Sequence, residues 1–456
     1  MEKITLNELV QSMNGSLLKE GSKHIYDAVS IDSRSLEPGS IFFAIRGENM
    51  DGHDYVASAV ATGAAAVVIH REDMGVRAAD AAVIKVDDTT QALLDFAGYY
   101  RSLFHIPIVA VTGSSGKTTT KDIVASVLSA KYNTLKTQGN LNNQTGMPLT
   151  VLQLNSSHEA AVIELGLCDK GEIATMAKSL RPDIGIVTNV GYSHLEKLGT
   201  RQGIYEEKVS LFADFGARNA AVVNRDDGFL KQYHSGNHAV IGVGISEGDI
   251  KATDVVLNEE GIEFCVNAER YSFSLPGRHN VYNCLVAVTI GKMLHLTQEE
   301  IQKGFDDFSP SKNRMDFQTV AEIMIINDCY NSNPDAARAA LDVLSDMQCD
   351  GKKIAVLADM LELGEQAGVL HEELGVYVAQ KNIDRVITVG EQAAHLAQGC
   401  RMGGMEEERV EHCLNNEQVV QYLVQTAHKG DCVLLKGSRG MHLEEVLSQF
   451  TERKRG

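Results

Sequence analysis

Residues 106–128 carry a predicted buried strand, a glycine-rich loop and an amphipathic helix in direct succession. A run rich in β-branched residues, Ile106–Val111, predicts the strand. Apolar residues at helical spacing predict the helix, at Ile123, Val124, Val127 and Leu128. Because such strand–helix units pack side by side, this segment favours an α/β fold built on a mostly parallel sheet.

The same alternation of short apolar runs and helical patterns continues along all 456 residues. At about 150 residues per domain, this length predicts about three domains, which we place at 1–86, 87–312 and 313–456. A helix is expected at Asp54–Thr62, a β-rich stretch at Thr253–Leu275 and an apolar helix at Val281–Leu294. Further strands are expected at Ser40–Gly47, Ala64–His70, Ala160–Glu164, Asp183–Asn189, Ala220–Asn224, His238–Val243, Glu322–Asp328, Lys353–Asp359, Arg385–Val389 and Asp431–Gly437.

Composition excludes several classes of function. The formal net charge of −19 argues against binding to a nucleic-acid backbone or an anionic membrane as the main activity. The 8 Cys include no CxxC pair, which argues against a disulfide framework or a zinc ribbon. The N-terminus lacks the apolar stretch of a signal peptide, and no run approaches the length of a membrane span. We therefore expect a cytoplasmic protein, and a monomer.

The glycine-rich loop has the residues of a phosphate-binding loop. Glycines let backbone N–H groups approach phosphate, and the following helix N-terminus adds partial positive charge. Lys117 is expected to reach the β- and γ-phosphates of ATP, and the hydroxyl of Thr118 to bind Mg²⁺. One departure is that Val111 stands where the usual pattern has its first glycine. The predicted ATP-binding residues here are Gly113, Ser114, Ser115, Gly116, Lys117, Thr118 and Thr119.

A second glycine cluster, at Gly242, Gly244 and Gly248, also follows a predicted strand. Its spacing is GxGxxxG, and no helical pattern follows it. A dinucleotide-binding loop would require both the GxGxxG spacing and a helix. We therefore predict a plain turn at this position.

Several longer motifs, in the same order along the chain, resemble the Mur ligase family, which comprises ATP-dependent amide-forming enzymes of peptidoglycan synthesis. The resemblance covers nearly the whole chain, because the motifs extend from the N-terminal to the C-terminal block. It implies a UDP-binding N-terminal domain, a central ATPase domain and a Rossmann-like C-terminal domain that binds the amine. Besides TGSSGKTTTK, the motifs are Asp32–Tyr55, Asn140–Leu152, Ile163–Gly166, Asn189–Thr200, Gly277–Asn283, Ser309–Phe317 and Asn327–Ala336.

Two further segments, Leu357–Gly364 and Leu434–Val446, are similar to the family member that adds D-alanyl-D-alanine. The resemblance therefore implies that D-alanyl-D-alanine is joined to UDP-N-acetylmuramoyl-tripeptide through an acyl phosphate and a tetrahedral intermediate. The alternatives are the sister enzyme that adds the third amino acid, the more distant folylpolyglutamate synthetase, and a non-catalytic P-loop nucleotide switch. The sequence leaves open whether the tripeptide ends in lysine or diaminopimelate.

The resemblance also implies roles for individual residues. Four catalytic residues are expected: Lys117, Glu164, His194 and Lys208. The metal ligands would be Thr118, Glu164, His194 and, if it is carbamylated, Lys208. Further ATP contacts are implied for Asn280, Asn283, Arg314 and Asp328.

Contacts to the other substrates are expected from all three blocks. Those on the UDP-peptide side are Ser33, Arg34, Asn140, Asn143 and Thr145. In the last block they are Tyr330, Asn331, Asn333, Asp359, Glu362, Lys436, Ser438 and Arg439. Lys436 and Arg439 flank a helix start where a carboxylate could bind, and Asp359 and Glu362 could meet an ammonium group. His371, a lone helix histidine, is expected to be structural.

Overall fold

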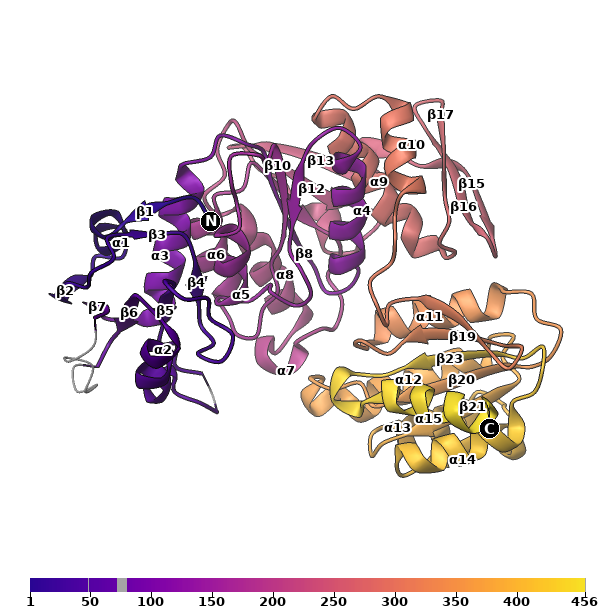
Figure 1. The fold of residues 1–456 in the computed structure, drawn as a ribbon. Helices are drawn as coiled ribbons and strands as arrows, with labels where there is room; N and C mark the ends of the chain where they lie inside the picture. Colours follow the sequence, from indigo (N-terminus) through magenta and orange to yellow (C-terminus); the bar gives the residue numbers. More distant parts are fainter. Residues whose placement is uncertain (48, 72–79, 456) are drawn as a thin grey trace. The chain divides into compact units, whose positions relative to one another are not determined.

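The structure of the protein is a computed structural model that describes residues 1–47, 49–71 and 80–455 (Figure 1). Glu48, which belongs to the motif Asp32–Tyr55, lies outside the described residues. The chain divides into two compact units. The first unit comprises Met1–Val111, Tyr132–Gly185 and Ser210–Asn219, and the second comprises Thr112–Lys131, Ile186–Val209 and Ala220–Gly456.

The N-terminal part of the first unit is a five-stranded sheet in the order β2-β7-β6-β5-β4. Its β2 is antiparallel to β7, whereas the other pairs are parallel. The expected strands at Ser40–Gly47 and Ala64–His70 are present in shorter form, and the expected helix begins as a 3₁₀ turn, Gly52–Tyr55, before α2. The elements are β2 (Ser16–Lys19), β4 (Val29–Ser30), β5 (Ile41–Phe43), α2 (Val56–Thr62), β6 (Ala66–Ile69), β7 (Ala82–Lys85) and α3 (Thr89–Ser102).

A seven-stranded sheet has the strand order β14-β13-β12-β11-β8-β10-β9. In the first unit β10 pairs in parallel with β8 and β9, and in the second unit β13 pairs in parallel with β12 and β14. The mostly parallel sheet expected for the middle of the chain is therefore confirmed. Its strands are β8 (Ile108–Thr112), β9 (Thr134–Lys136), β10 (Ala160–Glu164), β11 (Ile184–Val187), β12 (Ala220–Asn224), β13 (Ala239–Gly244) and β14 (Ile250–Lys251).

Helix α4 (Lys117–Ser129) directly follows the glycine-rich loop and packs against α9 (Arg278–Met293) and α10 (Gln298–Asp306). All four apolar residues that predicted α4 are fully buried, which confirms the amphipathic pattern. The close approach of α10 to α4 requires a glycine at position 304 of α10, because a Cβ there would lie 2.4 Å from the Cα of Val127. The β-rich stretch is a three-stranded antiparallel sheet of β15 (Thr253–Asn258), β16 (Gly261–Val266) and β17 (Glu269–Phe273).

The C-terminal part of the second unit is a six-stranded sheet in the order β18-β19-β23-β20-β21-β22. Only the edge pair β18–β19 is antiparallel, and helices connect the parallel strands. This is the Rossmann-like α/β arrangement expected for the last block. The elements are β18 (Asp316–Val320), β19 (Ile323–Asp328), α11 (Pro334–Asp346), β20 (Lys353–Ala358), α12 (Ala367–Ala379), β21 (Arg385–Val389), α13 (Ala393–Met402), β22 (Val410–Cys413), α14 (Asn416–Thr426), β23 (Cys432–Lys436) and α15 (Leu443–Arg455).

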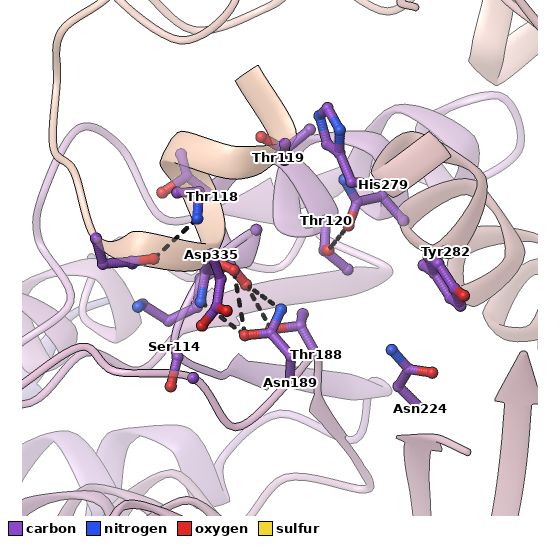
Figure 2. A pocket seen from close by; sticks show the side chains of 18 of the residues that line it. Ser114, Thr118, Thr119, Thr120, Thr188, Asn189, Asn224, His279, Tyr282 and Asp335 are labelled. Carbon is purple, nitrogen blue, oxygen red and sulfur yellow. Dashed lines mark hydrogen bonds between the residues drawn. The ribbon is translucent and has the colours of Figure 1, made fainter. Parts of the chain in front are cut away.

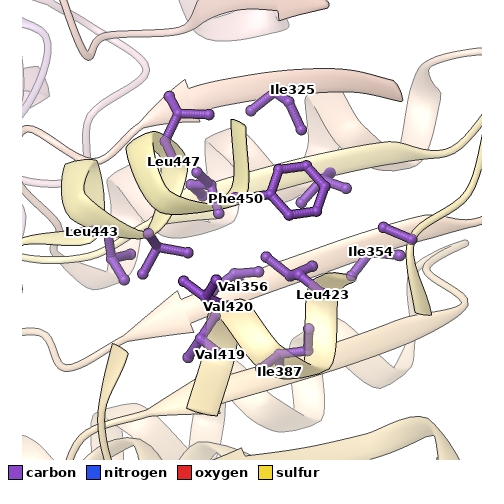
Figure 3. Packing of buried hydrophobic residues seen from close by; sticks show 14 of the residues in the cluster. Ile325, Ile354, Val356, Ile387, Val419, Val420, Leu423, Leu443, Leu447 and Phe450 are labelled. Carbon is purple, nitrogen blue, oxygen red and sulfur yellow. The ribbon is translucent and has the colours of Figure 1, made fainter. Parts of the chain in front are cut away.

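One face of this sheet is covered by α14 and α15 (Figure 3). Val420 and Leu423 of α14 and Phe450 of α15 pack on strand residues such as Ile325 and Val356, all at most 1% exposed. Burying a large apolar side chain of this kind contributes about 1.5–3 kcal/mol. The sheet therefore holds its strand ends, where predicted site residues lie, in fixed positions.

Across the described parts of the chain, no helix combines the length and apolarity that a membrane span requires.

Candidate nucleotide and ligase site

Two glycines give the loop between β8 and α4 its shape. Gly113 has φ of 147°, and a Cβ there would lie 1.9 Å from the Oγ1 of Thr188. Gly116 has φ of 76°, in the left-handed region, and precedes the first residue of α4. Both positions therefore require glycine. The Nζ of Lys117 donates to the carbonyl oxygen of Gly113 at 2.8 Å, which folds the lysine back over the loop.

The segment that follows β11 fixes this loop through hydrogen bonds (Figure 2). The backbone N–H of Ser115 donates to the Oδ1 of Asn189 at 3.0 Å, and the Nδ2 of Asn189 donates back to the carbonyl of Ser115 at 3.0 Å. The hydroxyl of Thr188 donates to the same carbonyl at 2.7 Å. These bonds preorganise the loop, so its remaining N–H groups are positioned for an anion before any ligand arrives.

A cavity of about 420 Å³ opens beside the loop, and its lining residues all belong to the second unit. Its volume is in the range of small-molecule sites. The walls come from the loop and α4, the segment after β11, α9, and the strand ends of the C-terminal sheet. Of the predicted nucleotide and substrate residues, the lining includes Ser114, Ser115, Gly116, Lys117, Thr118, Thr119, Asn283, Arg314, Asp328, Asn331, Asn333 and Lys436.

Asn280 and Asn283 form a buried chain of amide hydrogen bonds at the start of α9. The Nδ2 of Asn283 donates to the Oδ1 of Asn280 at 3.0 Å, and the Nδ2 of Asn280 donates to the carbonyl of Pro276 at 2.9 Å. The hydroxyl of Thr120 in α4 donates to the Oδ1 of Asn283 at 3.0 Å. Both amides therefore tie α9 to its neighbours, and Asn283 also faces the cavity.

Next to these amides, His279 and Tyr282 line the cavity. Burial lowers the pKa of His279, so its ring is held neutral near neutral pH. Burial and a hydrogen bond to Asp226 raise the pKa of Tyr282 to about 12, and its hydroxyl donates to the Oδ2 of Asp226 at 2.9 Å. A neutral, aromatic wall of this kind suits a nucleobase better than a phosphate.

Arg314 enters the cavity wall just after the predicted boundary at residue 312. Its guanidinium carbon lies 4.1 Å from the centroid of the Tyr330 ring, and that of Arg439 lies 5.7 Å from the same centroid. Tyr330 therefore lies within cation–π distance of both arginines.

Asp328 and Lys436 end two adjacent parallel strands and are direct register partners. The Nζ of Lys436 donates to the Oδ2 of Asp328 at 2.7 Å and to the carbonyl of Asn331 at 3.0 Å, and Lys436 is only 2% exposed. The structure therefore brings together a predicted ATP contact and a predicted amine-side residue. In this conformation the charge of Lys436 is neutralised by Asp328.

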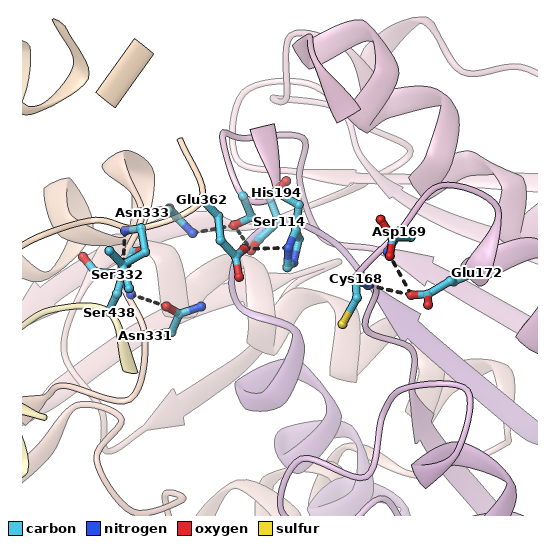
Figure 4. A network of polar contacts seen from close by, with 12 residues as sticks. Ser114, Cys168, Asp169, Glu172, His194, Asn331, Ser332, Asn333, Glu362 and Ser438 are labelled. Carbon is cyan, nitrogen blue, oxygen red and sulfur yellow. Dashed lines mark hydrogen bonds and ion pairs between the residues drawn. The ribbon is translucent and has the colours of Figure 1, made fainter. Parts of the chain in front are cut away.

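His194 lies in the turn before α7 (Leu195–Leu198), with φ of 60°. Its Nδ1 lies 2.7 Å from the Oε2 of Glu362, which follows β20 (Figure 4). This interaction lowers the pKa of Glu362 against the opposing effect of burial. A predicted metal ligand and a predicted ammonium-binding residue are thus paired with each other.

Other predicted residues of the last block hold its loops in place. The hydroxyl of Ser438 accepts from the backbone N–H of Leu361 at 2.9 Å, and the Oδ1 of Asp359 accepts from that of Ala393 at 2.7 Å. Asn333 caps α11 by accepting from Ala336. The structural role expected for His371 is confirmed, because it is fully buried, accepts from the N–H of Met360 and donates to Ala367.

In the first unit, Glu164 ends β10 and is 2% exposed. Its Oε1 accepts from the Nδ2 of Asn142 at 2.7 Å, while its Oε2 is buried with no hydrogen-bond partner. In the same loop the Oδ1 of Asn143 accepts from the N–H groups of Thr145 and Gly146, just at the start of α5 (Gly146–Val151). Asn140 is exposed.

Ser33 is buried, and Arg34 forms an exposed ion pair with Asp32 at 2.7 Å. Side-chain and backbone hydrogen bonds from Arg34 lower the pKa of Asp32 to about 2. The carboxylate therefore stays ionised and keeps this turn ordered at neutral pH.

Lys208 lies in α8 (Arg201–Val209) and is fully buried. At the second glycine cluster, Gly242 and Gly244 lie in β13, and the expected turn is present only at Gly248, which lies in the bend before β14. Among the described residues no group of three or more His, Cys, Asp or Glu side chains is arranged to hold a metal.

The sequence prediction missed several residues of the cavity: Thr188, Asn189, Arg201, Asp226, His279, Tyr282 and Asp335. Asp335 is the most notable, because its Oδ2 is buried without a hydrogen-bond partner and burial raises its pKa. A Cβ at Gly191 would lie 2.0 Å from that oxygen. Asp335 is the second residue of α11, two positions after the predicted Asn333, and this position was the available signal.

Three family models match consecutive segments of the chain. They are "Mur ligase family, catalytic domain" at residues 25–101, "Mur ligase middle domain" at 111–291 and "Mur ligase, glutamate ligase domain" at 313–439. The UDP-N-acetylmuramoyl-tripeptide–D-alanyl-D-alanine ligase of Bacillus subtilis (strain 168) is 35% identical, with 99% of each chain covered.

Two solved structures are similar over almost their whole length. A crystal structure of MurF from Acinetobacter baumannii has a TM-score of 0.91 at 31% identity, with 99% of both chains covered. MurF ligase from Thermotoga maritima in complex with ADP has a TM-score of 0.83 at 28% identity, and the match covers 94% of this chain and 98% of that one.

Proposed function

This chain belongs to the Mur ligase family, and we propose that it is an ATP-dependent ligase that joins D-alanyl-D-alanine to UDP-N-acetylmuramoyl-tripeptide in peptidoglycan precursor synthesis. The observation that carries the proposal is the preorganised phosphate loop beside a cavity of about 420 Å³, in a chain that matches D-alanyl-D-alanine ligases from end to end. The complex of the Thermotoga relative with ADP supports the use of ATP.

The chemistry requires that a carboxylate be activated before an amine can attack it. Transfer of the γ-phosphoryl group of ATP to the tripeptide carboxylate gives an acyl phosphate. The amine then adds to the acyl carbon, and the tetrahedral intermediate collapses with loss of phosphate. Lys117 and the loop N–H groups would neutralise the charge on the transferring phosphoryl group, which is where most of the catalysis of phosphoryl transfer arises.

Each unit holds a candidate ligand for Mg²⁺. In the first unit Glu164 offers a buried carboxylate oxygen without a hydrogen-bond partner. In the second unit Thr118 offers a hydroxyl in the first turn of α4. Mg²⁺ commonly binds one or two carboxylates and completes its shell with water and phosphate, so a large acidic cluster is not needed. Bound Mg²⁺ would neutralise phosphate charge; His194 and Lys208, the latter as a carbamate, remain the candidates for a second ion.

The C-terminal sheet supplies the proposed amine side. Arg439 is exposed near the ring of Tyr330 and is the cation best placed to meet the free carboxylate of D-alanyl-D-alanine. Lys436 would contribute after exchanging its bond to Asp328, and Glu362 would meet the ammonium group after leaving His194. We further propose that the turn with Ser33 and Arg34 contacts the uridine side, and the Asn140–Thr145 loop the muramoyl peptide.

A phosphate-release assay with a panel of substrates tests this function. The panel holds UDP-muramoyl dipeptide and tripeptides ending in lysine or diaminopimelate, each with D-alanyl-D-alanine, lysine or diaminopimelate as the amine. We expect release only from a tripeptide with D-alanyl-D-alanine. Release with the dipeptide and a single amino acid would assign the sister activity instead, and release that ignores the amine would indicate a nucleotide switch.

Isotope labelling tests the acyl phosphate. If the tripeptide carboxylate carries ¹⁸O, one labelled oxygen should appear in the product phosphate, because that oxygen bridges the carbonyl carbon and phosphorus. Unlabelled phosphate accompanied by normal amide formation would rule out the activation step.

A further inference from the structure

Two cysteines lie side by side in the C-terminal sheet, outside the nucleotide cavity. Cys432 is the first residue of β23 and is the register partner of Lys353, the first residue of β20. Cys349 lies in the connection between α11 and β20. Its Sγ donates to the carbonyl of Gly430, two residues before Cys432, at 3.1 Å. Cys349 also acts on the Cys432 thiol, whose pKa it helps to raise.

Backbone contacts fix the two segments against each other. The N–H of Cys432 donates to the carbonyl of Lys352 at 2.9 Å, and the N–H of Gly351 donates to that of Gly430 at 3.0 Å. The buried carboxylate of Asp431 accepts from the N–H of Lys352 at 2.7 Å. The thiols therefore remain neighbours as long as the sheet is folded, and a disulfide can join only cysteines that are held close together.

A cavity of about 360 Å³ is lined by both cysteines and gives a small molecule access to them. Cys349 is partly exposed, whereas Cys432 is 4% exposed. The acidic side chains of Glu259, Glu322 and Asp350 also line the cavity. Negative charge disfavours anionic oxidants such as oxidised glutathione, so a small neutral oxidant such as hydrogen peroxide suits this site.

The two thiols have different roles in such a reaction. Burial raises the pKa of Cys432 to about 12, so it stays protonated at neutral pH and reacts slowly by itself. Cys349 is the accessible partner and therefore meets the oxidant first. Cys432 begins β23 and Cys349 lies in the connection that leads into the start of β20, whereas Asp328 and Lys436 lie at the carboxyl ends of their strands, so the pair is separate from the nucleotide cavity.

We propose that Cys349 and Cys432 are a peroxide-sensitive dithiol that closes to an intramolecular disulfide. The sulfur of Cys349 attacks hydrogen peroxide, the O–O bond breaks, and a sulfenic acid and one water form. The sulfur of Cys432 then attacks that of Cys349, the S–O bond breaks, and a second water leaves. Two thiols are oxidised and one peroxide is reduced to two waters, and the bond links residues that are 83 positions apart in the sequence.

The test uses the full chain carrying Cys168→Ser, which removes the exposed cysteine and leaves seven. After treatment with hydrogen peroxide, thiol titration in denaturant should fall from seven to five. Intact mass should fall by two hydrogen atoms, and peptide mapping should find Cys349 joined to Cys432. Dithiothreitol should restore seven thiols.

Two matched variants distinguish the pair from general oxidation. Cys349→Ser should keep all its remaining thiols under the same treatment, because the accessible member is gone. Cys432→Ser should lose one thiol and retain a sulfenic acid at Cys349, which dimedone traps. A folded protein that loses no thiols, or that accumulates sulfinic acid at Cys349 without the cross-link, would overturn the proposal.

Discussion

The buried pair of Lys436 and Asp328 makes a quantitative prediction possible. Replacing Lys436 with Met keeps the volume of the side chain but removes the Nζ that donates to Asp328 and Asn331. The carboxylate of Asp328 is then left largely buried and uncompensated, because its side chain is only 16% exposed. Breaking a buried ion pair by removing one partner costs about 3–5 kcal/mol.

The chain offers a matched control in the connections that lead into β19 and β23. Lys429 pairs with Glu322, but the two side chains are 74% and 67% exposed, so Lys429→Met should leave stability nearly unchanged. A second control is the double variant Lys436→Met with Asp328→Asn. It removes the orphaned charge while keeping an acceptor for the N–H of Met315, so part of the lost stability should return.

Hydrogen exchange detected by mass spectrometry reads this effect locally, in peptides that cover β19 and β23. A loss of about 3–5 kcal/mol corresponds to about 10²–10⁴ in the protection of slowly exchanging amides. Equal protection in the Lys436→Met and Lys429→Met proteins would refute the reasoning. It would mean that Lys436 is free in solution to bind a substrate carboxylate, as its sequence context alone suggested.

Three further predictions concern other sites. Lys117→Ala should lower turnover by about 10²–10³ while the melting temperature stays unchanged, as measured by phosphate release and thermal scanning, since the lysine acts on developing phosphoryl charge. Unimpaired turnover would exclude this role. Arg34→Ala should raise the pKa of Asp32 from about 2 toward its ordinary value in an NMR titration, whereas Arg71→Ala should not. Because the folded pKa is the lower one, the interaction stabilises the fold above the unfolded pKa and is lost as the pH falls through about 2. Gly191→Ala should lower the melting temperature, at a cost of about 1–3 kcal/mol, because its Cβ would lie 2.0 Å from the Oδ2 of Asp335. Adding Asp335→Ala should recover most of that loss; no recovery would place the strain elsewhere.

Local sequence signals predicted the inner strands of both large sheets and the strand ends where the predicted site residues lie, but not the edge strands β9, β14, β18 and β22. Buried runs such as Ala160–Glu164 and Ala220–Asn224 coincide with β10 and β12, because β-branched and small apolar residues in short runs are typical of a strand covered on both faces. Asp328 and Lys436 could be placed at one sheet edge for the same reason, since parallel strands bring their carboxyl ends together.

Partnerships between distant residues could not be predicted in this way. The bond of Lys436 to Asp328 spans 108 positions, and that of Asn189 to Ser115 spans 74. Residue type fixes what a side chain can bind, but the partner depends on which strand ends become neighbours. His194 illustrates the point, because its sequence context resembles a metal site while its position opposite Glu362 follows only from the fold.

The fold also accounts for the valine at the start of the phosphate loop. Val111 lies inside β8 and is fully buried. The strand therefore continues through the position where the usual phosphate-loop pattern has its first glycine and the loop begins. The turn begins at Gly113 instead, where φ is 147° and a Cβ would lie 1.9 Å from the hydroxyl oxygen of Thr188. That hydroxyl is itself committed, because it donates to the carbonyl of Ser115. A glycine at 111 would therefore increase the backbone entropy that is lost when the strand folds, and it would not help to form the turn. The glycine at 113 is the one that the close contact with Thr188 requires.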